Sequence, residues 1–218
     1  MTTIRKTVII NRAVPGSGKT SITRCILNTL AERGLTFANH STDDYVMHDG
    51  KYCFDLLQLS HFHQCNLQAF ERDLLDQRDV VICDNTNLMP WQTAPYTRLA
   101  RQHHYQIVII NFPPRELWKH VQSQQVTPER PDAHQVPEDV LVRFIDAFNR
   151  YNPLLDPNTP LDATLFTDYT WDEQRNCAVP TQFPAQHFDS DHIITILPND
   201  YHHAKLTIGD TLLKLILA

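Results

Sequence analysis

The sequence predicts an α/β fold in which a parallel sheet carries helices on both faces and is followed by a C-terminal extension. Short β-branched runs alternate with amphipathic helical stripes over roughly residues 1–152, and this alternation is typical of such a sheet. A glycine-rich turn joins the first apolar run to the first helical stripe. Beyond residue 152 the alternation fades and prolines recur. We therefore expect a domain over 1–152 and an extension over 153–218.

The first half of this domain alternates buried strands with two long helices. Residues 7–10 form a β-branched run, as expected of a buried parallel strand. A helical stripe follows and ends at Gly34, a residue suited to helix C-termini. Residues 35–40 are the second expected strand. The next helix is indicated by apolar side chains three and four positions apart, at Leu56, Leu59, His63, Leu67, Phe70 and Leu74.

The second half repeats the pattern. Strands are expected at 80–83 and 107–110, with a helix from Pro90 to about His103 between them. A short helix is expected over 114–122, followed by a polar loop over 123–136. Pro137 opens the last helix of the domain, with acidic residues in its first turn. Its predicted apolar face comprises Val140, Phe144, Ala147 and Tyr151.

The extension carries no recognisable motif. Residues 192–197 are expected to add a strand to the sheet, residues 205–208 to form another strand, and residues 211–217 a short apolar segment. From Thr159 onward there are 3 basic and 8 acidic residues. The whole chain of 218 residues has a net charge of −6, so a strongly basic nucleic-acid footprint is absent.

Several other classes of protein are disfavoured. No apolar run approaches the length of a transmembrane helix, and no secretory signal stands at the start. We therefore expect a cytoplasmic protein with no membrane partner. Five cysteines without a C-x-x-C pair disfavour zinc and a disulfide framework. His63 is expected in the core. For Trp91, Tyr96 and Trp118, packing is favoured over stacking on a nucleobase.

The strongest functional signal is a phosphate-binding loop between the first strand and the first helix. Ala13 to Thr20 reads A-V-P-G-S-G-K-T, which matches the P-loop spacing with alanine at the first glycine position. Glycines let the backbone point several N–H groups inward, and the helix start adds positive potential. The motif predicts a P-loop NTPase fold and a nucleotide site. Its members would be Ala13, Val14, Pro15, Gly16, Ser17, Gly18, Lys19, Thr20 and Ser21.

Acidic residues follow two other strands. In such folds Lys19 contacts the β- and γ-phosphates, and the Thr20 hydroxyl coordinates Mg²⁺. Asp84 follows the third strand and could serve Mg²⁺, or cap the turn that it begins. Asp43 and Asp44 follow the second strand, where ligands sit in open α/β sheets. At least one of this pair is favoured as a base over a helix-capping role.

Three motifs together resemble a known family. R-A-V-P-G-S-G-K-T at 12–20, S-T-D-D-Y at 41–45 and D-N-T-N-L at 84–88 look like the P-loop kinase domains of polynucleotide 5′-hydroxyl kinases. The resemblance is strongest to the Nedd-binding-protein type of kinase domain. H-Q-V-P at 134–137 is similar to that family's H-G-V-P. The resemblance covers roughly residues 4–152.

The resemblance implies an ATP- and Mg²⁺-dependent kinase acting on a nucleic-acid 5′ end. Asp43 matches the general base, and Lys19 and Thr20 match the phosphate and metal contacts. Asp84 matches the acidic residue of the third motif, so Thr20 and Asp84 form the expected metal site. Arg130 is the only arginine in the expected lid segment, residues 123–136, and matches the lid arginines on the phosphates. Acceptor contacts are expected from Asp44, Tyr45 and Asn87.

Two departures leave the acceptor open. His120-Val121 stand where the family places Arg-Asn, and Val46 stands where a phage kinase has an acceptor-binding arginine. A small-molecule kinase acting on a nucleotide, nucleoside or nucleotide sugar, similar to zeta toxins, is therefore the second hypothesis. A non-catalytic ATP-binding switch is the third. A base at Asp43 argues against the switch, because a pure binder does not need one.

Overall fold

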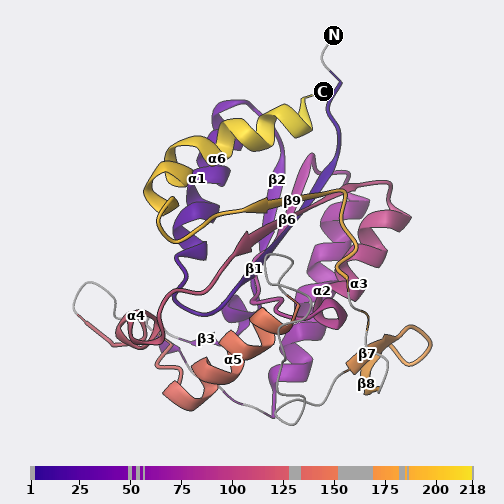
Figure 1. Cartoon of the computed structure of the whole chain (residues 1–218). Helices are drawn as coiled ribbons and strands as arrows, with labels where there is room; N and C mark the ends of the chain where they lie inside the picture. The colour runs from indigo at the N-terminus through magenta and orange to yellow at the C-terminus, as the bar shows by residue number, and fades with distance from the viewer. Residues whose placement is uncertain are drawn as a thin grey trace.

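A five-stranded parallel sheet forms the centre of the computed structural model, which describes residues 3–48, 51–52, 55, 57–127, 134–151, 169–181, 185 and 187–217. Its strand order is β2-β5-β1-β6-β9 (Figure 1). From β1 the chain passes to the edge strand β2, returns to β5 beside β1, and then crosses to β6 and β9 on the other side of β1. Such a reversal leaves a crevice at the carboxyl ends of the strands beside β1. The strand bounds are β1 Thr7–Ala13, β2 Phe37–His40, β5 Val80–Cys83, β6 Gln106–Phe112 and β9 His192–Thr195.

Helices cover both faces of this sheet. Helices α1 (Lys19–Glu32) and α6 (Tyr201–Ile216) lie against one face, and α2 (Leu59–Leu75) and α3 (Pro90–Gln102) against the other (Figure 1). Successive side chains of a strand point to opposite faces. Ile9 of β1 accordingly packs with α1 and α6, whereas Val8 and Ile10 pack with α2 and α3. The predicted fold class is confirmed.

Shorter elements surround the carboxyl edge of the sheet. The 3-10 helix η1 (Thr42–Tyr45) follows β2 and precedes a small hairpin of β3 (Met47–His48) and β4 (Lys51–Tyr52). Helix α4 (Leu117–Ser123) packs against α5 (Glu138–Arg150). A second hairpin, β7 (Tyr169–Asp172) with β8 (Cys177–Pro180), packs on α3. No helix within the described part of the chain is long and apolar enough to span a membrane.

The end of the chain differs from the prediction. Strand β9 pairs with β6 in parallel, from Val108–His192 to Asn111–Thr195. The strand expected at 205–208 and the segment at 211–217 are instead one helix, α6. Ile208, Leu212 and Ile216 recur at helical spacing and are buried against α1, so a four-residue repeat was misread as short runs. The division of the chain at residue 152 stays a prediction.

Two helical faces also differ from those expected. In α5 the buried residues are Leu141, Ala147 and Phe148, while Val140 and Phe144 face a cavity. In α2, Phe62 and Asn66 are buried beside Phe70 and Leu74, and His63 is exposed rather than in the core. In both helices part of the predicted core face lines the cavity instead. Polar Asn66 is tolerated in the interior because its Nδ2 donates to Tyr96 Oη at 2.9 Å.

Arg12 connects the sheet to the elements at its carboxyl edge. Its guanidinium is buried and donates to Leu88 O at 3.0 Å, Asn111 Oδ1 at 2.8 Å and Phe148 O at 2.6 Å. It also stacks 3.8 Å from the Phe148 ring centroid and 4.8 Å from that of Phe188. This one side chain therefore joins β1, the loop after β5, β6, α5 and the segment before β9.

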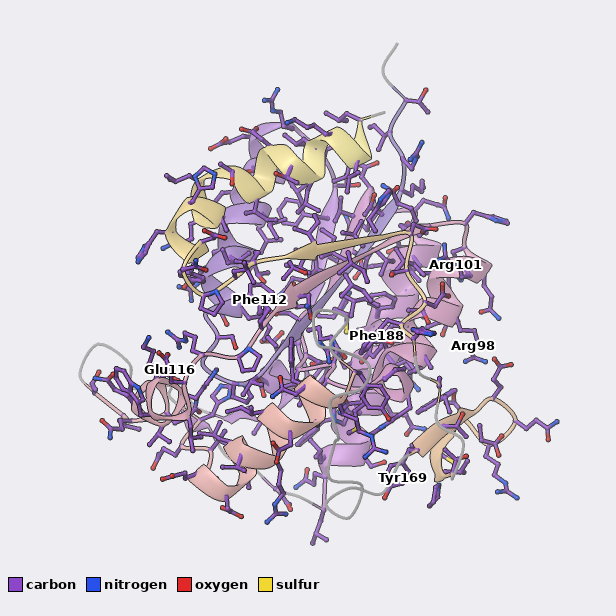
Figure 2. The ribbon with its side chains drawn as sticks, in the orientation of Figure 1. Arg98, Arg101, Phe112, Glu116, Tyr169 and Phe188 are labelled. Carbon is purple, nitrogen blue, oxygen red and sulfur yellow. The ribbon has the colours of Figure 1, made fainter. Side chains whose placement is uncertain are left out.

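The segment before β9 is held by a second arginine, at the end of α3. Arg101 pairs with Asp189 and with Asp191, each at 2.7 Å, and Asp191 Oδ2 also accepts the Ile107 N–H at 2.7 Å. Figure 2 labels Arg101 and Phe188 on this side of the molecule. These exposed ion pairs contribute modestly to stability, but they fix where β9 enters the sheet.

Helices α1 and α6 approach each other closely at Gly209. A Cβ on Gly209 would lie 2.7 Å from the Cβ of Thr29, whose hydroxyl is fixed by a 3.0 Å hydrogen bond to Cys25 O. Alanine is normally favoured over glycine within a helix by about 1 kcal/mol. Here we expect the opposite sign, because overpacking costs about 1–3 kcal/mol.

Gly209→Ala should therefore lower the free energy of unfolding, measured by urea denaturation. The same change made in a Thr29→Ala background should cost less or stabilise, because the clashing side chain is gone. Equal destabilisation in both backgrounds would contradict the close approach of α1 and α6.

Candidate active site at the carboxyl edge of the sheet

The P-loop spans the turn between β1 and α1. Gly16 and Gly18 have φ angles of +82° and +86°, in the left-handed region that favours glycine. A Cβ on Gly16 would overlap the Ser123 side chain, and one on Gly18 would lie 2.5 Å from the Tyr201 hydroxyl. Ser17 Oγ donates to Val14 O at 2.7 Å and tightens the turn. Both glycines are thus required by backbone conformation and by close neighbours.

Lys19 is positioned by the acidic residue after β5. Its Nζ donates to Asp84 O at 2.8 Å and lies 2.9 Å from Asp84 Oδ1. Asn11 Nδ2 also donates to Asp84 Oδ1, at 2.7 Å, and to Thr23 Oγ1 at 2.9 Å. The carboxylate is buried, and its Oδ1 is held by both Lys19 and Asn11. Asp84 therefore stands beside the phosphate loop, while its expected role toward a metal stays a prediction.

Two residues that sequence reasoning missed contact the P-loop: Arg115 from the loop before α4, and His120 from α4 itself. The Arg115 guanidinium donates to Gly16 O. His120 Nδ1 lies 2.8 Å from Pro15 O, and His120 Nε2 lies 3.0 Å from the Arg115 backbone nitrogen. A carbonyl only accepts and a backbone N–H only donates, so His120 is neutral with its proton on Nδ1. Burial lowers the pKa of His120, and the bond to Pro15 opposes that shift.

The extension also reaches the P-loop. Tyr201, the first residue of α6, donates its hydroxyl to Gly18 O at 2.9 Å. No linear motif marks Tyr201, because its contact depends on β9 joining the sheet and on α6 packing along α1. The one signal in the sequence is the helical spacing of apolar residues in α6 after the strand β9, and from the sequence alone those residues are assigned to a strand and an apolar segment.

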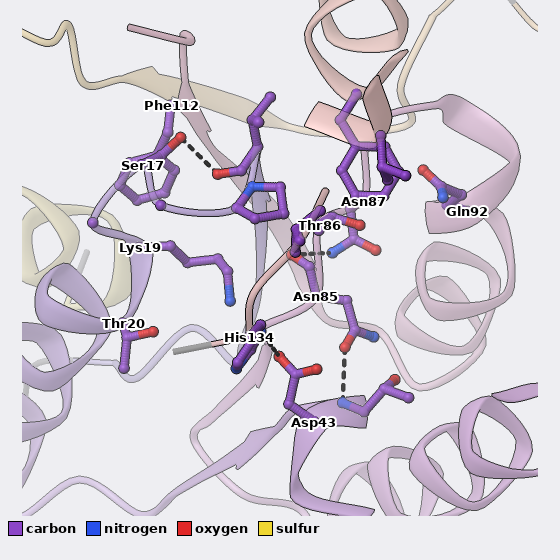
Figure 3. A pocket seen from close by; sticks show the side chains of 18 of the residues that line it. Ser17, Lys19, Thr20, Asp43, Asn85, Thr86, Asn87, Gln92, Phe112 and His134 are labelled. Carbon is purple, nitrogen blue, oxygen red and sulfur yellow. Dashed lines mark hydrogen bonds and ion pairs between the residues drawn. The ribbon is translucent and has the colours of Figure 1, made fainter. Parts of the chain in front are cut away.

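The expected base lies in η1. Ser41 caps this turn through a 3.3 Å bond from the Asp43 N–H, and Thr42 N donates to Asn85 Oδ1 at 2.9 Å. The Asp43 carboxylate is partly exposed and lies 3.8 Å from His134 Nδ1. In the view of Figure 3, Asp43 and His134 lie side by side below Lys19, with Asn85 next to Asp43.

The three expected acceptor residues have different surroundings. The Asp44 carboxylate is exposed, although partial burial raises its pKa. Tyr45 stacks on Phe62, with centroids 6.5 Å apart. Asn87 is buried, and its Nδ2 donates to Asn11 O at 2.8 Å, which gives it a role in holding the third motif to β1. Their contact with an acceptor stays a prediction. Val46 is buried at the departure noted above.

A cavity of about 2060 Å³ joins these groups. The P-loop, Arg24, Arg115 and Lys119 line one end, and all cationic Lys and Arg side chains among its described lining residues lie there. The other end is lined by neutral residues of α3, α5 and the β7–β8 hairpin. Arg130, the expected lid arginine, falls outside the described residues.

The donor set fits Mg²⁺ bound together with nucleotide phosphates. Mg²⁺ keeps several waters and needs only one or two protein oxygens beside phosphate oxygens. Thr20 is exposed on the cavity wall, and Asp84 supplies a second oxygen-bearing side chain next to Lys19. Among the described residues no cluster of three or more His, Cys, Asp or Glu side chains could hold a metal without such phosphates.

Comparison with known proteins agrees with the sequence motifs. Residues 8–151 match the family model AAA_33, described as an AAA domain. Over 148 residues the chain is 30% identical to human NEDD4-binding protein 2, a match that covers 66% of this chain and 8% of that protein. This chain therefore spans less than a tenth of its curated relative. The predicted family resemblance is confirmed.

Solved structures show the same fold. A protein of Chloroflexus aurantiacus J-10-fl described as a kinase superposes with a TM-score of 0.58 at 12% identity, covering 98% of this chain and 99% of that one. Kti12 of Chaetomium thermophilum, solved with ADP-AlF3, superposes with a TM-score of 0.53 at 13% identity, covering 97% and 99%. At these identities the likeness establishes the kinase-type P-loop fold.

The neutral His120 makes stability depend on pH. Its folded-state pKa lies below the ordinary 6.5, so its stabilising effect is present above pH 6.5 and is lost as pH falls through the lowered value. We expect His120→Gln to cost about 1–3 kcal/mol at pH 7.5, because Pro15 O and the Arg115 N–H lose their buried partner.

The measurement is thermal unfolding of both proteins from pH 7.5 to 5. The gap between wild type and His120→Gln should narrow below pH 6.5. Since His40 and His63 also have lowered pKa values in both proteins, only the difference between the two curves reports on His120. A gap that is constant with pH would contradict the neutral assignment.

Proposed function

This chain belongs to the AAA domain family AAA_33, and from that premise we propose that it transfers the γ-phosphate of ATP to a hydroxyl group. The acceptor that we propose is the 5′-hydroxyl of a polynucleotide. The observation that carries the proposal is the partly exposed Asp43 carboxylate, which lines the same cavity as Lys19 and the P-loop. A base facing a phosphate site is the arrangement that hydroxyl phosphorylation needs.

Each step of the transfer has a residue in place. The P-loop N–H groups and Lys19 hold the β- and γ-phosphates. Asp43 accepts the proton of the acceptor hydroxyl as its oxygen attacks the γ-phosphorus. The bond from phosphorus to the β–γ bridging oxygen then breaks, and ADP leaves with both electrons of that bond. Mg²⁺, when bound at Thr20 and Asp84, neutralises charge on the phosphates.

Other groups shape the donor end. Arg115 binds Gly16 O, which places a fixed positive charge next to the phosphate loop. His120 and Tyr201 brace the carbonyls of Pro15 and Gly18. These contacts preorganise the loop, so that its N–H groups need not reorient when nucleotide binds. The lid role of Arg130 and the division into residues 1–152 and 153–218 remain parts of the proposal, although Tyr201 contributes to the site from the second part.

A second candidate is an uncharged small-molecule acceptor. The observation that favours it is the absence of Lys and Arg side chains at the acceptor end of the cavity among its described lining residues. A nucleotide-sugar acceptor, whose diphosphate would be anionic, gains no support from that lining. The non-catalytic switch is disfavoured because Asp43 lies in the cavity, where a pure binder has no use for a base.

The test is phosphate transfer from γ-labelled ATP with Mg²⁺ to 5′-hydroxyl DNA and RNA oligonucleotides, beside a pool of nucleosides and nucleotide sugars. Label on oligonucleotides, lost in Lys19→Ala, is the expected result. Label only on nucleosides would favour the second candidate, whereas label only on nucleotide sugars would contradict both acceptors. ATP binding without label on any acceptor would favour the switch.

Asp43→Asn should lower kcat by about 10²–10⁴-fold, because the acceptor proton loses its base. The dissociation constant for ATP should stay within about twofold of wild type. The matched control is Asp210→Asn, which removes an exposed carboxylate of α6 outside the cavity and should retain full activity. Unchanged kcat in Asp43→Asn would remove this residue from the role of base.

A further inference from the structure

The β7–β8 hairpin forms an aromatic wall at the acceptor end of the cavity. The hairpin packs on α3, beyond the part of the chain that matches the family model. In Figure 1 it is the orange hairpin beside the lower end of α2 and α3. Tyr169 of β7 packs on Trp91 of α3, with ring centroids 5.4 Å apart. Trp91 and Trp171 both line the main cavity. We call Trp91, Trp171 and Gln92 the indole wall.

Polar groups of this wall lack partners. The indole nitrogens Nε1 of Trp91 and Trp171 are buried and form no hydrogen bond in the structure. Gln92 Oε1 accepts the Met89 N–H at 2.9 Å, while its Nε2 makes no hydrogen bond with the described residues. A buried indole N–H normally finds a partner, because leaving it unpaired costs free energy. Both Nε1 atoms are enclosed by protein, so the wall presents to the cavity the ring surfaces of Trp91 and Trp171 and the amide of Gln92.

The absence of Lys and Arg among the described residues that line the cavity beside the indole wall favours an uncharged ligand there. The cations among the described lining residues stand at the phosphate end, at Lys19, Arg24, Arg115 and Lys119. The hairpin contributes Trp171, Asn176, Cys177 and Ala178, which are all neutral. Phosphate groups are held by Lys, Arg or clustered backbone N–H groups. A flat, neutral ring with hydrogen-bond acceptors on its edge fits the wall, whereas a phosphate does not.

We propose that the indole wall binds the nucleobase of the acceptor's 5′-terminal nucleoside, so that its 5′-hydroxyl is presented to Asp43. This inference rests on the proposed function and names how that site recognises its acceptor. Stacking on an aromatic side chain is tolerant of sequence, since every base has a π-face. The Nε2 group of Gln92 is a donor that suits a carbonyl oxygen or ring nitrogen of a base. Recognition is thus of one terminal base rather than of a run of phosphates.

The experiment compares two 3′-fluorescein-labelled oligonucleotides that share a 5′-hydroxyl and the same phosphates. One has a normal 5′-terminal nucleoside, and the other has an abasic tetrahydrofuran residue at that end. Binding is followed by fluorescence anisotropy, and phosphate transfer from labelled ATP is measured separately. Wild-type protein should bind the normal end about tenfold more tightly than the abasic end, a factor within the range for stacking of one base.

Variants assign this preference to the wall. Trp171→Ala should weaken binding of the normal end about tenfold and leave the abasic end almost unchanged. Trp171→Phe keeps a ring without the N–H and should recover part of the loss. Leu206→Ala, an exposed side chain of α6 away from the cavity, is the control. Thermal unfolding and the dissociation constant for ATP establish that each variant is folded.

The outcomes separate this inference from the proposed function. Equal binding of the two ends by wild type, or an equal loss for both ends in Trp171→Ala, overturns the inference even if transfer is active. Base-dependent binding that needs Trp171, with no transfer to any oligonucleotide, supports the inference and contradicts the proposed kinase acceptor. Base-dependent binding with transfer, in which Trp171→Ala raises KM more than it lowers kcat, supports both.

Discussion

The buried guanidinium of Arg12 is the interaction on which the elements at the carboxyl edge of the sheet depend. Its burial lowers its pKa to about 9, so it stays charged at neutral pH, and no carboxylate in the described part of the chain pairs with it. A buried cation must be compensated fully or it destabilises the fold. Here Leu88 O, Asn111 Oδ1, Phe148 O and the Phe148 ring do so. A shift of α5 or of residues 84–88 would leave this charge uncompensated. The cavity walls that these elements form are therefore fixed relative to β1, the strand that leads into the P-loop.

The P-loop is held by segments that lie far apart in the sequence. Arg115 binds one of its carbonyls from the loop before α4, His120 binds another from α4, and Tyr201 binds a third from the first turn of α6. Each of these groups contacts a carbonyl of the turn and none occupies one of its backbone N–H groups, so they hold the loop without using the donors that an anion needs. Gly16 and Gly18 are needed for the turn itself and also because Ser123 and Tyr201 occupy the space of a Cβ. The donor site is therefore a product of the whole fold, including the extension, and the nine-residue motif supplies only its inner surface.

Local chemistry made the strands and the donor site predictable. β-branched runs located β1, β5 and β6, and the motifs located Lys19, Asp43 and Asp84 at the carboxyl ends of strands. The missed features all depend on tertiary packing. His120 drew attention only as a departure from a family pattern, yet its two ring nitrogens bridge Pro15 and Arg115. The sequence predicts a strand and an apolar segment where the structure has helix α6. Its buried residues at 208, 212 and 216 fall into two short apolar runs, which resemble strands when each is considered alone. His63 was assigned to the core from its spacing, although a cavity interrupts that face of α2.

Charge is divided within one continuous cavity, and this division sets the direction of any transfer. Lys19, Arg115 and the P-loop give one end positive charge, whereas neutral side chains of α3 and the β7–β8 hairpin line the other, and the partly exposed Asp43 lines the same cavity. An ATP molecule that entered the acceptor end would leave its phosphates without counter-charges, and a neutral nucleoside at the donor end would leave Lys19 paired with Asp84 and the loop N–H groups unused. In the proposed reaction this difference in charge would sort the two ligands, and the acceptor hydroxyl would meet the γ-phosphate where the charged and neutral parts adjoin. An acidic protein can act on a nucleic-acid end in this way, because holding one terminal base does not require the broad positive field that binding a phosphate backbone demands.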